Sequence, residues 1–496
     1  MIIKTSADEI QNFLSDASNY SGFCDAVYFP ENEKDIASIL KLCNEKKIKV
    51  TAAGNGTGLT GSRVPEGGVV ISLERMNKIL ELNKKEKYVI VQPGVILKDL
   101  QDFVEQQKLF YPPDPTERNC FIGATAATNS SGARTFKYGA TRNYILALRI
   151  VSADGQTFEI SREKFKASGY EAMMTTESGN IISFELPRYK MPDTKNAAGY
   201  YCKENMDLID LFIGSEGTLG IITELKLKLL DLPEDILSCV VFFNDENNAL
   251  DFVDEARRLS EIFFNPEDES SSAKINARGL EFFDKYSLDF LRKDYPNIPA
   301  HAESAVWFEQ ELTNDNDSLV DDWMHLIKKF NGSEEDSWIA IDRNEQEKFK
   351  DFRHAISWKV NEFITQHGLK KVGTDAAVPH NFFKRFYFEC KRKVEDAKLD
   401  YVVYGHFGNA HMHLNMLPKN QNEYDIAKKI YAEICEDAVQ YNGTISAEHG
   451  VGKSKRDYLL KMYGEETIKE MARLKLVFDP NAILGIGNIF DERYLA

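Results

Sequence analysis

Apolar residues recur at helical spacing in several segments of the chain. Between residues 33 and 48, one face of the expected helix carries Ile36, Ile39, Leu40 and Cys43, because residues three and four apart lie on the same side of a helix. The same spacing predicts helices over 98–107, 248–259 and 456–480, the last ending before Asp479-Pro480.

Short apolar runs bounded by turn residues predict strands. Runs at 87–95 and 236–243 are of this kind, and 146–160 indicates a hairpin, because Asp154-Gly155 suits a tight turn. Residues 211–230 indicate a short apolar segment, a glycine-rich turn and a strand, and the tail at 483–490 indicates a strand end bent by glycine. The pattern of helices and strands changes after Leu232-Pro233, so we expect the main domain boundary there.

Two segments predict loops. Residues 111–139 are rich in Pro, Gly, Ser and Thr and show little periodicity, and so long a loop within a compact domain is usually functional or disordered. Its small residues allow the backbone to approach a ligand closely. The polar tract at 263–275 predicts an exposed loop.

The composition is that of a globular protein of enzyme size. The chain has 496 residues, enough for two large domains or about three ordinary ones. Its 61 basic and 78 acidic residues give a net charge of −17, which disfavours nucleic acid and bare anionic membrane as partners. No apolar run approaches the roughly 18 residues that a membrane span needs, and the first ten residues lack the apolar region of a signal peptide.

The seven cysteines include no CxxC pair. This spacing disfavours a disulfide framework, a thiolate zinc site and an iron–sulfur cluster, and it favours a reducing cytoplasm.

Three glycine-rich segments lie in the first half of the chain, at 54–62, 123–132 and 214–220. Glycines let neighbouring N–H groups converge on an anion, and Ser and Thr add hydroxyl donors, so the natural ligand is a dinucleotide pyrophosphate. One such segment alone is more often an ordinary turn, but three together favour a cofactor. The first imitates a nicotinamide-binding fingerprint, yet a loop and a strand follow it instead of a long helix, so we disfavour that cofactor.

Four of the nine histidines fall within 406–449. His411 and His413 share one face if 411–415 is a strand, and His406 reaches them if Gly408-Asn409 makes a turn. A single histidine here is more often an ordinary core or loop residue, but the cluster with Glu448 predicts a divalent metal site suited to zinc or manganese. His449, beside that carboxylate, is a candidate general base.

Six motifs follow one another along the chain: GNGTGLTG, PPDPTERNCFIGATAATNSSGARTFKYGATRNY, LFIGSEGTLGIIT, GHFGNAHMHLN, SAEHGVGKSKRDYL and FDPNAIL. In this order they resemble the FAD-linked D-2-hydroxyacid dehydrogenases, flavoproteins of the vanillyl-alcohol-oxidase type that include D-lactate dehydrogenase, D-2-hydroxyglutarate dehydrogenase and the glycolate oxidase flavoprotein subunit. The resemblance runs from about residue 20 to the C-terminus. It implies an α+β fold with a two-subdomain FAD-binding domain over 1–232, a cap or substrate domain with antiparallel sheet and helices over 233–455, and a C-terminal segment over 456–496 that completes the FAD domain.

The resemblance also implies a set of site residues. FAD is expected to be noncovalent, since 51–62 contains no His or Cys for a covalent link there. The implied flavin-binding residues are Gly54, Asn55, Gly56, Thr57, Gly58, Leu59, Thr60, Gly61, Ser62, Pro113, Gly123, Ala124, Thr128, Asn129, Gly132, Ala133, Arg142, Glu216, Gly217, Gly220, Ile221 and Ile222. The implied metal ligands are His406, His413 and Glu448, with zinc expected first and manganese second. His449 matches the catalytic base, Arg353 the arginine that grips the substrate carboxylate, and Asn415 a substrate contact.

Two positions depart from the family pattern. GHxGDGNxH becomes GHFGNAHMH, so Asn409, Ala410 and His411 replace Asp, Gly and Asn, and His411 is either an extra ligand or a partner of a ligand. A lysine common in the family is Gly373 here, with Lys370 and Lys371 close but out of register. In some family members that lysine helps to bind a carboxylate, so its absence makes a dicarboxylate substrate less expected. D-lactate is therefore the first expected substrate and D-2-hydroxyglutarate the second.

The predicted reaction is oxidation of a D-2-hydroxy acid to the 2-oxo acid, with hydride transfer to flavin N5 and metal-assisted deprotonation by His449. Three alternatives stay open: an ether-lipid-type transferase on the same fold, a flavin-binding protein with a vestigial site, and a metal hydrolase without flavin. The expected electron acceptor is a separate quinone, cytochrome or electron-transfer flavoprotein, and any iron–sulfur relay is expected on another protein. We expect a cytoplasmic location, or one peripheral to the inner membrane, and a homodimer stays open.

Overall fold

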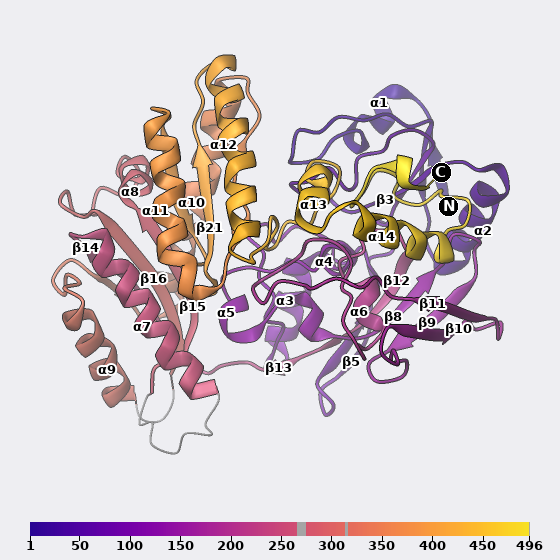
Figure 1. Ribbon diagram of the computed structural model, residues 1–496. Helices are drawn as coiled ribbons and strands as arrows, with labels where there is room; N and C mark the ends of the chain where they lie inside the picture. The colour runs from indigo at the N-terminus through magenta and orange to yellow at the C-terminus, as the bar shows by residue number, and fades with distance from the viewer. Residues whose placement is uncertain (265–273, 313–315, 496) are drawn as a thin grey trace. The chain divides into compact units, whose positions relative to one another are not determined.

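The computed structural model describes residues 1–264, 274–312 and 316–495. The described chain divides into two compact units (Figure 1). Unit 1 comprises Met1–Ser131, Ala140–Leu232 and Ile445–Ala496, and unit 2 comprises Gly132–Gly139 and Pro233–Thr444.

Unit 1 contains a four-stranded sheet in the order β1-β2-β4-β3. Its strands are β1 (Ile2–Lys4), β2 (Ala26–Phe29), β3 (Val50–Ala53) and β4 (Val69–Ser72), and β2 and β3 both run parallel to β4. Helix α2 (Glu33–Lys46) begins at Asn32, whose side chain accepts a hydrogen bond from Asp35 N, and ends at Lys47 in the left-handed conformation. The predicted apolar face of this helix is confirmed, since its four residues are buried against the sheet.

A second sheet of unit 1 is antiparallel and has the order β5-β6-β12-β8-β9. It contains the predicted hairpin, in which Gly155 has a φ of 81°. Its strands are β5 (Ile79–Asn83), β6 (Tyr88–Val91), β8 (Ile145–Val151), β9 (Thr157–Ser161) and β12 (Ile221–Lys228). Two small pairs complete the strands of unit 1, β7 (Leu109–Phe110) with β13 (Leu230–Asp231) and β10 (Glu171–Thr175) with β11 (Ile181–Glu185).

The α-helices of unit 1 are mostly short. Besides α2 they are α1 (Ala7–Ile10), α3 (Leu97–Gln106), α4 (Ile122–Thr128), α6 (Ile209–Phe212), α13 (Arg456–Tyr463) and α14 (Glu465–Phe478). The helix predicted over 456–480 is thus two helices, because Gly464, with a φ of 80°, ends α13 and precedes α14.

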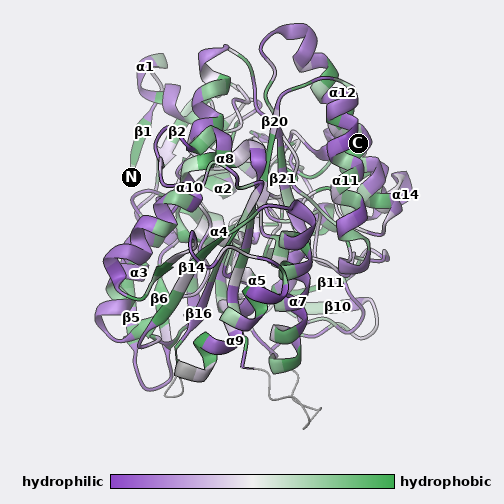
Figure 2. Cartoon of the chain, turned by 90° about the vertical axis from the view of Figure 1, so that its left-hand side faces the viewer, coloured by the Kyte–Doolittle hydropathy of each residue, from purple (hydrophilic) through white to green (hydrophobic). Residues whose placement is uncertain are grey.

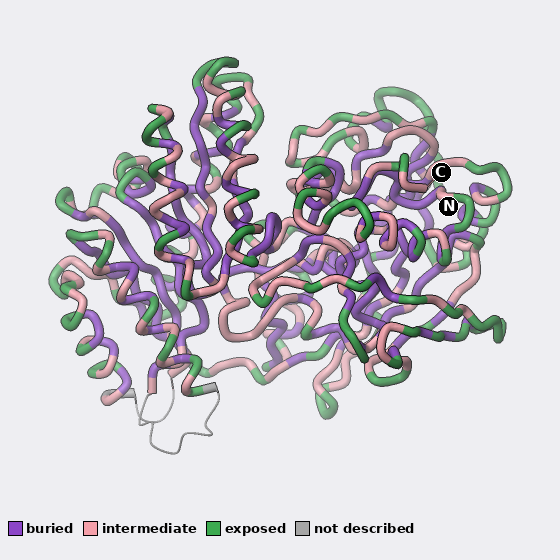
Figure 3. The backbone as a smooth tube through the Cα atoms, in the orientation of Figure 1, coloured by how far each residue is buried: buried purple, intermediate pink, exposed green. Residues whose placement is uncertain are grey.

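Unit 2 is built on an eight-stranded sheet in the order β17-β14-β16-β15-β20-β21-β18, with β19 also paired to β21. The strands are β14 (Ile236–Phe243), β15 (Ala277–Asp284), β16 (Ser304–Glu311), β17 (Trp338–Ala340), β18 (Val372–Gly373), β19 (Ala376–Ala377), β20 (Tyr401–Gly405) and β21 (His411–Met416). Most of their residues are buried, whereas the helices around them expose their outer sides (Figure 3).

Helices cover both faces of this sheet. One face packs against α7 (Glu246–Phe264), α9 (Asn316–Lys329), α11 (His380–Asp396) and α12 (Gln421–Gln440). The other face packs against α8 (Lys285–Leu291) and α10 (Arg343–Gln366). Hydrophilic and hydrophobic residues alternate along helices such as α12, as amphipathic helices of this kind require (Figure 2).

Two expectations for local structure differ from what the chain forms, and a third falls mostly outside the described residues. Residues 111–139 are not one loop, since α4 and α5 (Thr135–Tyr138) lie within them. The tail at 483–490 forms a single bridge from Leu484 to Val50 and no strand, because Gly485 and Gly487 both have positive φ. Most of the polar tract predicted at 263–275 lies outside the described residues, and residues 263–264 continue α7.

The unit boundaries also differ from the expected ones, although the change of unit at 232/233 coincides with Leu232-Pro233. Residues 132–139 belong to unit 2, where Lys137 Nζ lies 2.9 Å from Glu311 Oε2 and Tyr138 donates to the same carboxylate. Residues 445–455 belong to unit 1, so the second boundary falls at 444/445 and not at 455/456. Side-chain bonds that join segments far apart in the sequence determine both differences.

Candidate active site

Unit 1 contains a cavity that is open to solvent. All three glycine-rich segments contribute to its wall. The lining residues are Ala52, Ala53, Gly54, Ser62, Arg63, Leu73, Pro93, Phe121, Gly123, Ala124, Ala127, Thr128, Ser215, Glu216, Gly217, Gly220, Ile221 and Ile222.

Two of the lining glycines cannot be replaced without strain. A Cβ on Gly123 would lie 2.4 Å from Pro93 Cβ, which is far inside van der Waals contact. Gly217 has a φ of 72°, which side chains rarely allow. The cavity wall is therefore formed largely by backbone and small side chains, and it fits a ligand with a phosphate group such as a dinucleotide.

The structure brings part of the predicted flavin-binding set to this cavity. The residues that line it are Gly54, Ser62, Gly123, Ala124, Thr128, Glu216, Gly217, Gly220, Ile221 and Ile222. The other predicted residues of unit 1, which stay predictions, are Asn55, Gly56, Thr57, Gly58, Leu59, Thr60, Gly61, Pro113, Asn129 and Arg142. Gly132 and Ala133 belong to unit 2, and their contact with flavin also stays a prediction.

Arg142 has a structural role within unit 1. Its guanidinium donates to the main-chain oxygens of Asp210 and Ile213 and to the Asp210 carboxylate. Burial lowers the pKa of this arginine from its usual value, while Asp210 opposes the shift. The residue thus joins the chain near 142 to helix α6.

The cavity also has lining residues that the sequence did not indicate. Arg63 and Pro93 are examples, and Arg63 Nη1 donates to Gly54 O at 2.8 Å. Arg63 directly follows the first glycine segment, and this adjacency is the one feature of the sequence that could have indicated its place in the cavity wall.

The segment that carries the predicted base is anchored to the cavity wall. Glu216 Oε1 accepts a hydrogen bond from Val451 N and Glu216 Oε2 accepts one from Gly452 N, both at 2.7 Å. Burial raises the pKa of Glu216 to about 7, although these N–H groups and nearby lysines oppose the shift. His449 therefore lies two residues from a bond that joins its segment to the third glycine segment.

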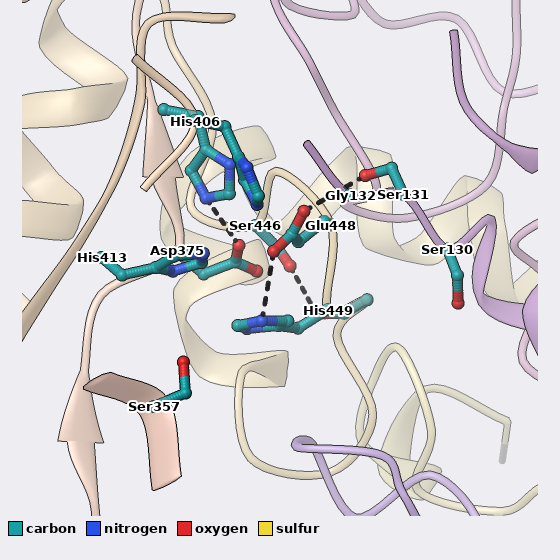
Figure 4. Close-up of polar contacts among 12 residues, drawn as sticks. Ser130, Ser131, Gly132, Ser357, Asp375, His406, His413, Ser446, Glu448 and His449 are labelled. Atoms are coloured by element: carbon teal, nitrogen blue, oxygen red, sulfur yellow. Dashed lines mark hydrogen bonds and ion pairs between the residues drawn. The ribbon is translucent and has the colours of Figure 1, made fainter. Parts of the chain in front are cut away.

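Within unit 1, Glu448 and His449 lie in a charged cluster (Figure 4). Lys195 Nζ is 2.6 Å from Glu448 Oε2, and Ser131 Oγ donates to the same oxygen at 3.3 Å. The His449 Nε2 atom lies 3.6 Å from Glu448 Oε1, which is long for a hydrogen bond. Lys195 was not predicted, because nothing in its sequence surroundings relates it to residue 448.

In unit 2, the sheet places the predicted residues on one face. Strand β20 ends at Gly405, η3 (Phe407–Asn409) makes the turn, and β21 begins at His411, so both conditions for bringing the three histidines together are met. Alternation along β21 buries Met412, Leu414 and Met416 on the opposite face. His411, His413 and Asn415 therefore point to the face that α10 covers.

The three histidines of unit 2 form a compact group. Their ring centroids are 5.2 Å apart for His406–His411, 5.4 Å for His406–His413 and 4.6 Å for His411–His413. One ring nitrogen from each lies within 4.8 Å of the others, a spacing that could hold a metal ion.

Residues distant in sequence orient the rings. The His406 Nδ1 atom is 2.7 Å from Glu281 Oε1, and His413 Nδ1 is 3.2 Å from Thr374 O. His411 Nε2 is 3.0 Å from Asp375 Oδ1, and Figure 4 shows Asp375 beside His406 and His413. Metal-binding histidines usually have such a partner on the second nitrogen.

Arg353 on α10 is held by the same network. Its Nε donates to Glu281 Oε2 at 3.0 Å, and its guanidinium lies 5.8 Å from the Trp307 ring centroid. Burial by itself raises the pKa of Glu281, but the charges of His406 and Arg353 outweigh it and hold that pKa well below its usual value. Glu281 thus links the predicted substrate arginine to a predicted metal ligand.

Asn415 packs against the position of the missing family lysine. A Cβ on Gly373 would lie 2.3 Å from Asn415 Oδ1, so any side chain there would displace the amide. A side chain at 373 would therefore change the position of the Asn415 amide.

Comparison with known proteins identifies the class. Residues 24–161 match the FAD binding domain model and residues 268–489 match the model of the C-terminal domain of FAD linked oxidases. A solved structure of alkyldihydroxyacetonephosphate synthase superposes with a TM-score of 0.65 at 17% identity, covering 97% of this chain and 81% of that chain. These matches confirm the predicted fold, that of an FAD-binding enzyme with a mixed helix and antiparallel-sheet second domain.

Two curated relatives narrow this class to a family. The chain is 31% identical to the glycolate oxidase subunit GlcD of Bacillus subtilis over 95% of this chain and 90% of the relative. It is 30% identical to a D-lactate dehydrogenase of Anaerostipes hadrus over 92% of this chain and 87% of the relative. The chain therefore belongs to the FAD-linked D-2-hydroxyacid dehydrogenase family.

Among the described residues, no helix combines the length and the apolar character that crossing a bilayer requires.

Proposed function

We propose that the protein oxidises a D-2-hydroxy acid, with D-lactate first, to the 2-oxo acid, using FAD bound noncovalently in the cavity of unit 1. One observation carries this proposal: Glu216 lines the cavity and also bonds to Val451 N and Gly452 N, next to the candidate base His449. The proposed base and the proposed flavin site are therefore parts of one unit.

The chain's own residues then have separate roles. His449 accepts the proton of the substrate hydroxyl, and a neutral imidazole suits that role near neutral pH. Arg353 binds the substrate carboxylate through the N–H groups that do not face Glu281, and its planar fork fixes the orientation of the acid. FAD, when bound, supplies the hydride acceptor.

A divalent metal completes the proposal. His406, His413 and Glu448 would hold it, and a metal supplies polarisation of the substrate hydroxyl. Lys195 and Ser131 both engage Glu448 Oε2, and these contacts orient the carboxylate. We favour zinc over manganese, because imidazole nitrogens suit zinc well.

A second substrate, D-2-hydroxyglutarate, has one observation in its favour. The Lys371 Cε atom lies 3.3 Å from the Cβ position of Gly373, so the stem of this lysine runs over the site where the family lysine is missing. Its ammonium would pair with a second carboxylate. Turnover of D-2-hydroxyglutarate that falls in Lys371→Met, with D-lactate turnover unchanged, would support this candidate.

A steady-state assay with an artificial dye acceptor tests the proposed reaction. We expect D-lactate to be oxidised and L-lactate to be inert. Arg353→Lys should raise KM for D-lactate by at least about tenfold, because lysine cannot form the bidentate contact. No dye reduction with any 2-hydroxy acid would contradict the proposal and favour the transferase or a vestigial site, and a protein that never binds flavin would favour the metal hydrolase.

The natural electron acceptor is proposed to be a separate quinone, cytochrome or electron-transfer flavoprotein. Supplying each one in place of the dye would show which of them sustains turnover.

A further inference from the structure

His411 is the residue by which this cluster departs from the family motif. It stands where the family has Asn, yet its side chain lies within the histidine group and not apart from it. The rings of His411 and His413 are 4.6 Å apart, closer than either is to His406. All three histidines offer a ring nitrogen within 4.8 Å of the other two.

Each of the three rings has its own polar partner within 3.2 Å. Glu281 and Thr374 O contact the Nδ1 atoms of His406 and His413, whereas Asp375 contacts the Nε2 atom of His411. Every ring therefore has a second nitrogen that takes no part in that contact. A ring oriented in this way is the usual state of a metal-binding histidine.

The partner of His411 is a carboxylate in the core. The side chains of both His411 and Asp375 are 0% exposed. A carboxylate at Nε2 favours the tautomer with its proton on that atom, which leaves a lone pair on Nδ1. The arrangement of carboxylate, imidazole and ligand atom is the one seen around zinc in proteins.

We propose that His411 is a third imidazole ligand of the metal centre, oriented by Asp375, and that it makes this centre select zinc or cobalt over manganese. The inference builds on the proposed metal-assisted function. A third nitrogen donor in place of an amide favours borderline metals, since manganese prefers oxygen ligands. Three histidine ligands with an open position are also a known form of catalytic zinc site.

Metal binding to the metal-free full chain tests this inference without any substrate. Zn²⁺ and Mn²⁺ are titrated in turn against a chelating dye. For the wild type we expect zinc to bind on the order of 100-fold more tightly than manganese. His411→Asn restores the family residue. It should lower the affinity for zinc by about 10- to 100-fold, while the affinity for manganese changes by less than about threefold.

Two further variants sharpen the result. Asp375→Asn keeps the shape of the partner and removes its charge, so zinc affinity should fall by about tenfold. His301→Asn is the matched control, because His301 also pairs with an aspartate, Asp336, at 3.2 Å but with 56% of its side chain exposed. It should leave both affinities unchanged.

Equal zinc affinity in wild type and His411→Asn would overturn the inference. If that variant does not fold, X-ray absorption at the zinc edge of the wild type decides instead, since it counts imidazole ligands. A signal from two imidazoles contradicts the inference, and a signal from three supports it. Zinc selectivity in a protein whose flavin no hydroxy acid reduces would leave this inference intact and contradict only the proposed function.

Discussion

The candidate sites of the two units are formed by different kinds of chemical groups. In unit 1 the cavity wall is backbone and small side chains, and Gly123 has no space for a Cβ. In unit 2 two of the three histidines contact acidic side chains, His406 at Glu281 and His411 at Asp375, and Glu281 also bonds to Arg353. A site made of backbone depends on shape, whereas a site made of charged side chains depends on the balance of its network.

This difference predicts different responses to mutation. Substitution of a glycine in unit 1 should remove the cofactor and leave the metal in place. Loss of a charge in unit 2 should weaken metal binding and leave the cofactor bound. The substitutions of Gly123 and Glu281 below test this separation, and each prediction has its own measurement.

The largest effect is expected at His449. His449→Ala should cut turnover by about two to four decades, the usual size of a general-base contribution. FAD content should stay that of the wild type, because Glu216 bonds to Val451 and Gly452 and not to the His449 ring. Turnover at saturating D-lactate and neutral pH checks this, and wild-type turnover would remove His449 from the role.

Gly123→Ala should weaken FAD binding by up to about 100-fold, since the new methyl group forces Pro93 or the backbone to shift and such overpacking costs about 1–3 kcal/mol. Gly179→Ala is the matched control, because a Cβ there meets no heavy atom within 4 Å and Gly179 lies outside the predicted flavin-binding residues. Fluorescence titration of the apoprotein with FAD measures both variants. Equal losses of FAD affinity in the two variants would show that the lack of space for a Cβ at Gly123 is not the cause.

Glu281→Gln should lower metal affinity by about tenfold, because the amide keeps an acceptor for His406 but loses the charge that pairs with Arg353. FAD content should not change. Glu303→Gln removes a carboxylate of the same type from an exposed ion pair with Lys285 and should affect neither. A loss of FAD in Glu281→Gln would break the proposed separation between the units.

The smallest effect concerns stability. Asp284 of unit 2 accepts hydrogen bonds from Ser287 N and Val403 N, and burial raises its pKa from 3.8 to about 6. An acid whose pKa is raised on folding contributes stability below its unfolded pKa and loses it as the pH rises through the folded value. Unfolding free energy should therefore fall between pH 3.8 and about 6.

Asp284→Asn keeps the acceptor oxygen and removes the titration. It should reduce that fall by about 1 kcal/mol, against a ceiling of about 3 kcal/mol for the full shift. All four tryptophans lie in unit 2, so their fluorescence during urea unfolding follows this unit. An unchanged pH dependence in Asp284→Asn would contradict the assignment.

The same contrast explains what the sequence could predict. The glycine segments were found because backbone recognition requires glycine at fixed spacings, and the strand carrying His411 and His413 followed from alternation. Glu281, Asp375 and Lys195 were missed because long-range folding alone brings them to their partners, as with Glu281 and His406, 125 residues apart. The segment at 445–455 was assigned to the wrong side of the boundary for a similar reason, since its bonds to Glu216 leave no local signal.

The proposed reaction requires a D-2-hydroxy acid to deliver its hydride to the flavin of this protein. The most direct test is the visible absorption spectrum of the FAD-loaded protein under anaerobic conditions, recorded before and after addition of D-lactate, with L-lactate as the control. We expect the flavin band to bleach with D-lactate and not with L-lactate. A flavin band that no D-2-hydroxy acid bleaches would contradict it.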